Sequence, residues 1–592
     1  MLDFENYITF DNIVNQLAQH RSKLSFYTHK NIYLEKYCKE KKWKSKDPYK
    51  ISDQVFLETL LPPRSEWVRP KGAELRKKFS STIELNKASI KNRIKIVHNC
   101  FKSKKITFAE TPRWYRNLRY FIFELNIEIL QNTNLNLERP NIFPSKKKPE
   151  DKTNTERRPL AKSFLREKII LSITNKYLTT VFDDLFLKCS YAFRSVNSDG
   201  VSPTYHQAVR ELKKFRLKKS EIPLYVAECD IKKFFDCLDH DIVKTNYFKL
   251  KEKLEIKGRV IHPSAEKIFM RYLEFYSFNK DVYPKNKDLN FWQSMNDHSP
   301  LGQFGWVDEM IDKVGKNKHK NIGIPQGGAL SGLIVNMVMH IADEQMLSNK
   351  GFGEKYIYLR YCDDMVIVHS NPKSCADMFS SYIKKLQELE LIAHQCKPHL
   401  QRYNKQYWED VKSRSTYLWS RKRNENFANA PWVSFLGYLI SDEGEIKVRK
   451  KSLLKQVVKH DLELEKVIKK LSYQTDEEIL KSKGSIINSV SHKMASMAVG
   501  KVDLDNYKNI PVSMCWAAGF KLLEKNRFTG QQLRLLDSSR QKNLHHLRKY
   551  IKKRTAKIET ESNKFSKKKK EDTIYPKYPF SFYSILDRPI KI

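Results

Sequence analysis

The sequence has few cysteines and glycines and no long apolar run. Its nine cysteines, spread over 592 residues, form no C-x-x-C pair, which disfavours both a disulfide framework and a zinc module and favours a reducing cytoplasm. No apolar run approaches the ~18–20 residues of a membrane span, and the first residues lack the basic and apolar regions of a secretory signal. With 18 glycines and 12% aromatic residues, the chain is not generally disordered. These absences predict a folded cytoplasmic protein that does not cross a membrane.

Acidic residues are scarce relative to basic ones. Lys and Arg number 110 against 68 Asp and Glu, which gives a formal net charge of +42. A surface this rich in cations attracts phosphate groups, and nucleic acid gains further affinity by releasing its counterions. A very soluble surface without a partner is the alternative explanation. We therefore expect a nucleic-acid partner.

Shifts in composition along the chain suggest four regions. Residues 1–150 have helical patterns rich in Lys, Tyr and Phe and end in a polar stretch with two prolines. Residues 151–440 alternate apolar strands with helical patterns, as in an α+β catalytic core. Residues 441–500 are helical again, with apolar side chains at helical spacing. Residues 501–592 are expected to form a helical extension with a basic tail.

Two adjacent acids lie between two strand-like segments of the third quarter of the chain. Asp363 and Asp364 separate the apolar segments 356–359 and 365–368. A tight turn is a usual place for Asp, so a structural role is the plain alternative. The acidic pair at 183–184 lacks flanking strands and is interpreted as structural. The strands around Asp363 shift the balance towards a catalytic role, because a tight hairpin holds carboxylates rigidly at the end of a sheet.

A second apolar strand also ends in an acid. The segment 224–229 leads directly into Asp230. If this strand neighbours the strands around Asp363, the two carboxylates meet although 363 − 230 = 133 residues separate them. Such carboxylates repel each other unless cations neutralise them, and hard oxygen ligands near phosphate suit Mg²⁺. Two ions ~3.5–4 Å apart stabilise both the attacking and the leaving oxygen of a phosphoryl displacement.

A glycine-rich loop precedes a well-patterned helix. The loop, 323–332, contains Gln326 and Gly327, and glycines let a backbone approach a ligand closely. Loops of this kind bind phosphate in many folds, so the signal is weak by itself. The apolar stripe of the following helix is interpreted as core packing.

In this order, the three segments resemble the palm motifs of reverse transcriptases. Motif A corresponds to the segment that begins at Cys229 and Asp230, motif B to 323–328, and motif C to the Tyr-x-Asp-Asp box at 361–364. Other segments resemble the remaining motifs: 158–160 and 190–194 in the fingers, Lys397 in motif D and 435–438 in the motif E hairpin. The resemblance covers roughly residues 158–500 and is closest to the group II intron-like branch of bacteria.

The resemblance implies an α+β right-hand polymerase with fingers, palm and thumb between mainly helical extensions. It implies an RNA-directed DNA polymerase, a nucleotidyltransferase that adds dNTPs with the help of two Mg²⁺ ions. Asp230, Asp363 and Asp364 are the implied catalytic residues, and together with Ile231 they are the implied metal ligands.

The resemblance also assigns residues to the incoming nucleotide. Phe235 lies under the sugar, where a bulky ring excludes a 2′-hydroxyl and favours deoxynucleotides. Gln326 and Gly327 line the nucleotide, and Arg158 clamps the triphosphate, since guanidinium donors suit phosphate oxygens. Lys397 protonates the leaving pyrophosphate. The alternatives are that Phe235 is a core residue, that Arg158 belongs to a surface charge cluster and that Lys397 is solvated.

The region after motif E resembles a thumb that grips the template–primer duplex. Arg449, Lys450 and Lys451 open this region and are the implied nucleic-acid contacts, made mostly to phosphates. The implied partners are an RNA template, a DNA product and dNTPs. Whether a dedicated noncoding RNA, a second copy of the chain or another protein also takes part is left open.

Long extensions without an endonuclease module resemble the defence-associated reverse transcriptases of bacteria, including abortive-infection proteins. An antiviral role against phage is the resulting prediction. Gly332 stands where intron-encoded enzymes generally carry Pro, which argues against an ordinary intron maturase. The alternatives are a mobile-element enzyme of the group II intron or retron type, and a nucleic-acid-binding scaffold with an inactive palm. An RNA-dependent RNA polymerase is disfavoured by Phe235 and by the Tyr-Cys-Asp-Asp box.

Overall fold

The structure of this chain is a computed structural model that divides into two compact units. The first comprises Met1–Ile13 and Tyr120–Gly444, and the second comprises Val14–Arg119 and Glu445–Ile592. The residues that the structure describes are 3–29, 48–70, 82–131, 135–146, 157–195, 203–294, 304, 321–397, 412–422, 426–499 and 527–563.

A six-stranded sheet forms the centre of the first unit. The strands run in the order β4-β5-β3-β7-β6, and β8 pairs with β7. Their bounds are β3 (Tyr225–Cys229), β4 (Tyr356–Tyr361), β5 (Asp364–His369), β6 (Cys396–Lys397), β7 (Ser413–Trp419) and β8 (Asn429–Ala430). The central strand β3 is antiparallel to both β5 and β7. Every residue of β3 is buried, as expected for a central strand that is covered on both faces, and its one charged residue, Glu228, forms an ion pair with Arg414 of β7 (2.6 Å).

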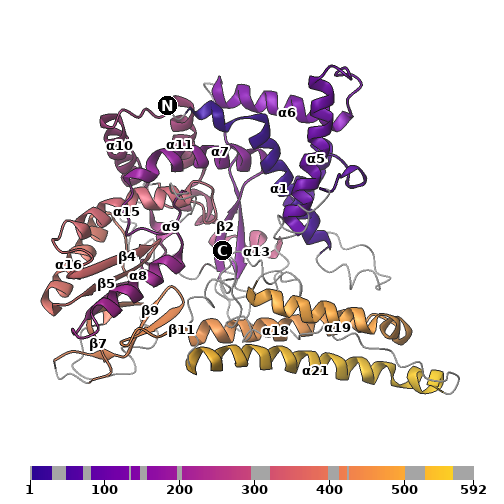
Figure 1. Cartoon of the computed structure of the whole chain (residues 1–592). Helices are drawn as coiled ribbons and strands as arrows, with labels where there is room; N and C mark the ends of the chain where they lie inside the picture. Colours follow the sequence, from indigo (N-terminus) through magenta and orange to yellow (C-terminus); the bar gives the residue numbers. More distant parts are fainter. Residues whose placement is uncertain are drawn as a thin grey trace. The chain divides into compact units, whose positions relative to one another are not determined.

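Helices hold this sheet in place (Figure 1). Helix α16 (Pro372–Glu388) packs on β3, β5 and β7, and α8 (Tyr205–Lys218) packs on β4. Helix α15 (Ser331–Leu347) packs against α16 and against α10 (His240–Ile256). The start of α16 is fixed locally, because the Asn371 side chain accepts a hydrogen bond from the backbone of Ser374 and Pro372 occupies the first turn.

Two hairpins and several shorter helices complete the first unit. Strand β1 pairs with β2 antiparallel, and β9 pairs with β10. The two residues between β9 and β10, Leu436 and Gly437, both have positive φ (49° and 86°), which suits a tight hairpin turn. The bounds are η1 (Phe4–Tyr7), β1 (Asn141–Lys146), β2 (Arg157–Lys162), α7 (Leu165–Phe182), η3 (Asp183–Leu185), α9 (Phe234–Cys237), α11 (Pro263–Phe275), α12 (Phe278–Asp281), η4 (Pro284–Lys287), α13 (Leu289–Ser294), β9 (Trp432–Phe435) and β10 (Tyr438–Ser441).

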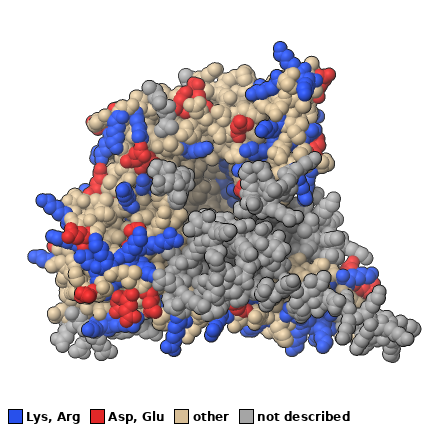
Figure 2. Space-filling view, viewed as in Figure 1, with Lys and Arg blue, Asp and Glu red and all other residues tan. Residues whose placement is uncertain are grey.

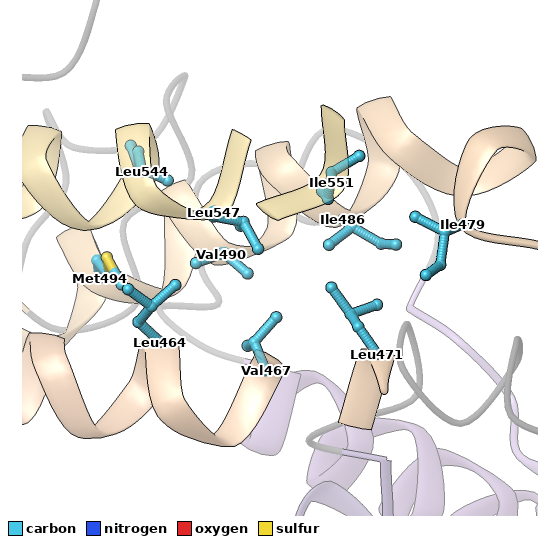
Figure 3. Packing of buried hydrophobic residues seen from close by; sticks show 10 residues of the cluster. All are labelled: Leu464, Val467, Leu471, Ile479, Ile486, Val490, Met494, Leu544, Leu547 and Ile551. Carbon is cyan, nitrogen blue, oxygen red and sulfur yellow. The ribbon is translucent and has the colours of Figure 1, made fainter. Parts of the chain in front are cut away.

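Three long helices of the second unit share one apolar core (Figure 3). They are α18 (Lys450–Leu471), α19 (Asp476–Val499) and α21 (Arg527–Asn563). The buried side chains of the cluster are Leu464, Val467, Leu471, Ile479, Ile486, Val490, Met494, Leu544, Leu547 and Ile551. Full burial of one such side chain contributes about 1.5–3 kcal/mol, so burial of this cluster explains why the three helices associate. Helices α18 and α19 lie within residues 441–500, after the short strand β11 (Ile446–Val448).

The other elements of the second unit are helical, apart from one short strand. They are α1 (Phe10–His29) and α6 (Arg113–Leu130), which each span the boundary between the units, and α3 (Pro48–Leu60), η2 (Arg64–Glu66), α5 (Thr82–Lys102) and β11 (Ile446–Val448).

The described surface carries many basic side chains (Figure 2), and the described cysteines form no disulfide. Lys and Arg side chains are spread over the visible described surface, with Asp and Glu among them (Figure 2). The cysteines within the described ranges are free thiols. Of the helices in the described part of the chain, none has the length and apolar character that crossing a membrane requires.

Candidate active site

Asp230 lies at the end of the central strand, next to the motif C hairpin. Cys229 of β3 faces Met365 of β5 across the antiparallel ladder, so Asp230 follows at the level of Asp364. Facing residues of such a ladder have Cα atoms ~4.5–5.5 Å apart. The Asp230 backbone nitrogen donates to Oγ of Ser413 (3.1 Å). The predicted meeting of the two acidic segments is therefore confirmed by strand pairing.

Asp363 lies in the two-residue turn between β4 and β5. Tyr361 faces Asp364 at the end of this hairpin, which leaves Cys362 and Asp363 as the turn. Cys362 has a φ of 61°, a left-handed conformation that is uncommon for a residue other than glycine. The turn presents Asp363 and Asp364 beside the end of β3.

The three carboxylates influence one another electrostatically. Burial, and then the charge of Asp230, raise the pKa of Asp363. The pKa of Asp364 is raised to about 7, mainly because neighbouring protein atoms remove water from its carboxylate. The negative charges of Asp363 and Asp230 raise it further, although part of the Asp364 surface is exposed. Within the described residues, the oxygens of the three side chains do not all lie within 4.8 Å of one another.

Asp363 and Asp364, whose pKa values neighbouring carboxylates help to raise, form together with Asp230 a donor set that fits divalent cations. A cation between them would remove the repulsion, and their hard oxygens match Mg²⁺. Ile231, the remaining implied ligand, is buried and forms a single bridge with Ala393.

Two cationic or titratable side chains near Asp230 were not identified from the sequence. Nζ of Lys412 lies 2.8 Å from Oδ2 of Asp230, and Nε2 of His394 lies 3.8 Å from the same oxygen. Nζ of Lys412 and Nε2 of His394 are 3.0 Å apart. Lys412 directly precedes β7, and no local sequence pattern indicates that β7 pairs with β3.

The motif B loop is attached to the motif A segment by hydrogen bonds. The backbone nitrogen of Ile324 donates to the carbonyl of Phe235 (2.7 Å), and that of Gly323 donates to Leu238 (2.7 Å). Nε2 of Gln326 donates to both carboxylate oxygens of Asp236, at 2.9 and 2.8 Å. Phe235 itself is partly exposed.

Gly327 and Arg158 lie near this junction. Gly327 has a φ of 84°, and a Cβ added there would meet no atom within 4 Å. Leu160 of β2 forms a bridge with Gln326, and Arg158, exposed on the same strand, acts electrostatically on Asp236. The structure thus brings Arg158, Gln326, Gly327 and Phe235 into one neighbourhood.

The remaining predicted site residues are placed only in part. Lys397 belongs to β6, but its side chain lies outside the described residues. Arg449, Lys450 and Lys451 are exposed around the start of α18 in the second unit, a different unit from the one that holds the aspartates.

The acidic pair at 183–184 and Gly332 have structural explanations. Asp183 accepts a hydrogen bond from Nε of Arg194 (2.8 Å) and one from the backbone of Ser195 (2.9 Å). This agrees with a structural interpretation. At Gly332, a Cβ would come within 2.5 Å of the Phe193 ring, so the packing of that ring explains the glycine.

Comparison with known proteins identifies the domain around these residues. Residues 146–440 match the family model "Reverse transcriptase (RNA-dependent DNA polymerase)", whereas no curated protein matches the chain. Solved structures with some similarity include apo telomerase from Candida tropicalis, at 12% identity over 83% of this chain and 78% of that chain (TM-score 0.32). Telomerase from Candida albicans in complex with a TWJ fragment of telomeric RNA is 12% identical over 87% and 81% (TM-score 0.30).

The family match confirms the predicted fold class and enzyme class. Residues 146–440 are a reverse transcriptase domain with the right-hand polymerase fold, and the chain is an RNA-directed DNA polymerase, a nucleotidyltransferase. This identification rests on the matched sequence and on the sheet described above.

Proposed function

We propose that Asp230 and Asp363, assisted by Asp364, hold two Mg²⁺ ions and that the chain copies RNA into DNA at this place. The observation that carries the proposal is the pairing of β3 with β5, which puts acids 133 residues apart at one end of a sheet (363 − 230 = 133). When bound, the ions supply charge neutralisation for the attacking and leaving oxygens of the phosphoryl transfer.

The protein's own residues bind and orient the nucleotide. In this proposal, Arg158 binds the triphosphate through charge-assisted hydrogen bonds. Phe235 bounds the sugar and excludes a 2′-hydroxyl, while Gln326, held by Asp236, lines the site together with Gly327. Supporting this assignment, Phe235 is partly exposed and is hydrogen-bonded through its carbonyl to the loop that carries Gln326.

Two cationic roles complete the proposed reaction. Lys397 is proposed to protonate the leaving pyrophosphate. Arg449, Lys450 and Lys451 are proposed to hold the template–primer duplex through its phosphates, and their exposure supports this assignment.

The test is the replacement of Asp363 with asparagine. Asparagine keeps the size of the side chain and loses the charge, so incorporation of labelled dNTP on an RNA template with a DNA primer should fall at least ~1000-fold, equivalent to ~4 kcal/mol of barrier. RNA affinity and the melting temperature should stay close to those of the parent protein. Asp241→Asn, which changes an exposed acid at the start of α10, is the matched control. Incorporation by Asp363→Asn at the level of this control would contradict the proposal and favour an inactive scaffold.

For the biological role we propose antiviral defence in the cytoplasm, with a dedicated noncoding RNA as the template. The support is the length of chain outside the reverse transcriptase domain, 145 residues before it and 592 − 440 = 152 after it, together with the resemblance to defence-associated enzymes. Cells that express the parent protein should form fewer phage plaques than cells that express Asp363→Asn. Equal plaque numbers, together with intron or retron RNA in the copurified nucleic acid, would favour the mobile-element alternative instead.

A further inference from the structure

Strand β4 carries a fully buried arginine just before the catalytic turn. Arg360 has no exposed surface and lies in an otherwise apolar strand. Its guanidinium makes two hydrogen bonds to Asp343: Nε to Oδ1 at 2.8 Å and Nη2 to Oδ2 at 2.7 Å. Asp343 is also buried. Burial alone would lower the pKa of Arg360, but the charge and hydrogen bonds of Asp343 raise it above the ordinary value. Two parallel hydrogen bonds thus make this a bidentate ion pair inside the protein.

The other donors of Arg360 reach separate segments of the chain. Nη2 lies 2.8 Å from Oγ of Ser190 and 3.3 Å from Oδ1 of Asn336. Asn336 and Asp343 both belong to α15, the helix that follows the glycine-rich loop, whereas Ser190 lies in the segment after η3. One planar group thus fixes strand β4 relative to two other parts of the same unit.

The last donor of Arg360 reaches the turn itself. Nη1 donates to the backbone carbonyl of Cys362 at 3.2 Å. Cys362 has the left-handed φ of 61°, which costs a residue with a Cβ about 1 kcal/mol or more and persists only where surrounding groups determine it. Asp363 and Asp364 follow directly, so the orientation of this peptide sets the direction of both carboxylates.

Stability alone does not explain an ion pair at this place. Two buried charges lose their hydration, and apolar residues of similar volume are often as stabilising or more so. Replacing the pair would nevertheless leave the Cys362 carbonyl without the donor that Arg360 supplies. Of the groups that Arg360 binds, the Cys362 carbonyl is the one that belongs to the catalytic turn.

We propose that Arg360, held by Asp343, is a positioning residue that fixes the Cys362 peptide and thereby aims Asp363 and Asp364 for the polymerase reaction. The inference rests on the proposed function of these aspartates. It differs from that function in assigning part of the catalytic geometry to α15, through a side chain that touches neither substrate nor metal.

The experiment compares two double variants with the full-length parent protein. Arg360→Met/Asp343→Leu removes both charges together and so leaves no unpaired charge in the interior. The matched control is Lys251→Met/Glu266→Leu, which removes an ion pair between α10 and α11 with an N–O distance of 2.7 Å. Melting temperature, kcat, KM for dNTP and the Mg²⁺ concentration for half-maximal rate are measured for each protein.

We expect Arg360→Met/Asp343→Leu to remain folded, with a lower melting temperature because the Cys362 carbonyl and the Tyr358 hydroxyl lose their partners. The folded variant should show a kcat at least ~10-fold lower, since small misplacements of reacting groups cost up to ~100-fold. KM for dNTP should stay within about twofold, and half-maximal rate should need several times more Mg²⁺ because the carboxylates are no longer aligned. The control should keep the parent values. A parent-like kcat and Mg²⁺ requirement in the double variant would overturn the inference.

A second variant keeps the inference testable if the double variant does not fold. Arg360→Lys retains a charge for Asp343 but cannot donate to Asp343, Ser190 and Cys362 together. It should be folded, with a reduced kcat and an increased Mg²⁺ requirement; parent values for both would overturn the inference. If the parent protein itself incorporates no dNTP, the proposed function fails, whereas an active parent with unaffected variants contradicts only the positioning role.

Discussion

Replacing Asp236 with asparagine should change stability in a direction that depends on pH. The Asp236 carboxylate has no exposed surface and accepts hydrogen bonds only from the neutral amide of Gln326 among the described residues. Burial raises its pKa from 3.8 to about 7, although the hydrogen bonds from Gln326 and the charges of Lys233 and Arg158 act in the opposite direction. The folded protein therefore favours the protonated acid.

The effect of Asp236 on the free energy of unfolding, and its dependence on pH, follow from the difference in pKa between the folded and unfolded chain. Below pH 3.8, the folded and unfolded chains both hold this proton, and Asp236 has no effect on pH dependence. As the pH rises from 3.8 to about 7, the unfolded chain releases the proton first, so the folded state loses ~1.4 kcal/mol per pH unit. Between pH 5 and pH 7, the loss amounts to ~3 kcal/mol, and it is complete above the folded pKa.

Asparagine does not ionise, and its oxygen can still accept from Gln326. The variant loses ~1 kcal/mol of hydrogen bonding at every pH but avoids the pH-dependent loss. We expect Asp236→Asn to be about as stable as the parent at pH 5 and more stable by a few kcal/mol at pH 8, as measured by denaturant unfolding. Asp241→Asn, at an exposed acid of the next helix, is the control. A stability difference between variant and parent that does not grow from pH 5 to pH 8 would refute the reasoning.

Two further predictions concern the nucleotide and the duplex. Phe235→Ala should open space for a 2′-hydroxyl and lower the preference for dNTP over rNTP by ~10–100-fold in kcat/KM; unchanged selectivity would count against its contact with the sugar. Replacing Arg449, Lys450 and Lys451 together with glutamine should reduce the slope of log affinity against log salt by up to ~3, because each phosphate contact contributes ~0.9. Binding titrations at several salt concentrations measure this slope, and an unchanged slope would show that these side chains do not contact phosphates.

The strands and the acids were predictable because their signals are local. The apolar segments before Asp230 and around Asp363 became β3, β4 and β5, and Tyr-x-Asp-Asp became a tight turn. The contact of Lys412 with Asp230 was not predictable, because it depends on β7 pairing with a strand 183 residues earlier in sequence, as in the hydrogen bond between Ser413 and Asp230. Arg360 did leave a signal, since a charged residue inside an apolar strand must find a buried partner.

One continuous segment, the glycine-rich loop followed by α15, contacts both halves of the catalytic site. The loop binds the motif A segment through Gln326 and Asp236, and the helix binds the motif C strand through Asp343 and Arg360. Backbone pairing of β3 with β5 sets how far apart the two strands lie, but it does not orient the turn beyond the end of the ladder. The orientation of the turn depends on the side chain of Arg360, which Asp343 of α15 holds in place. A substitution on this helix should therefore affect the metal requirement of the reaction more than the stability of the sheet.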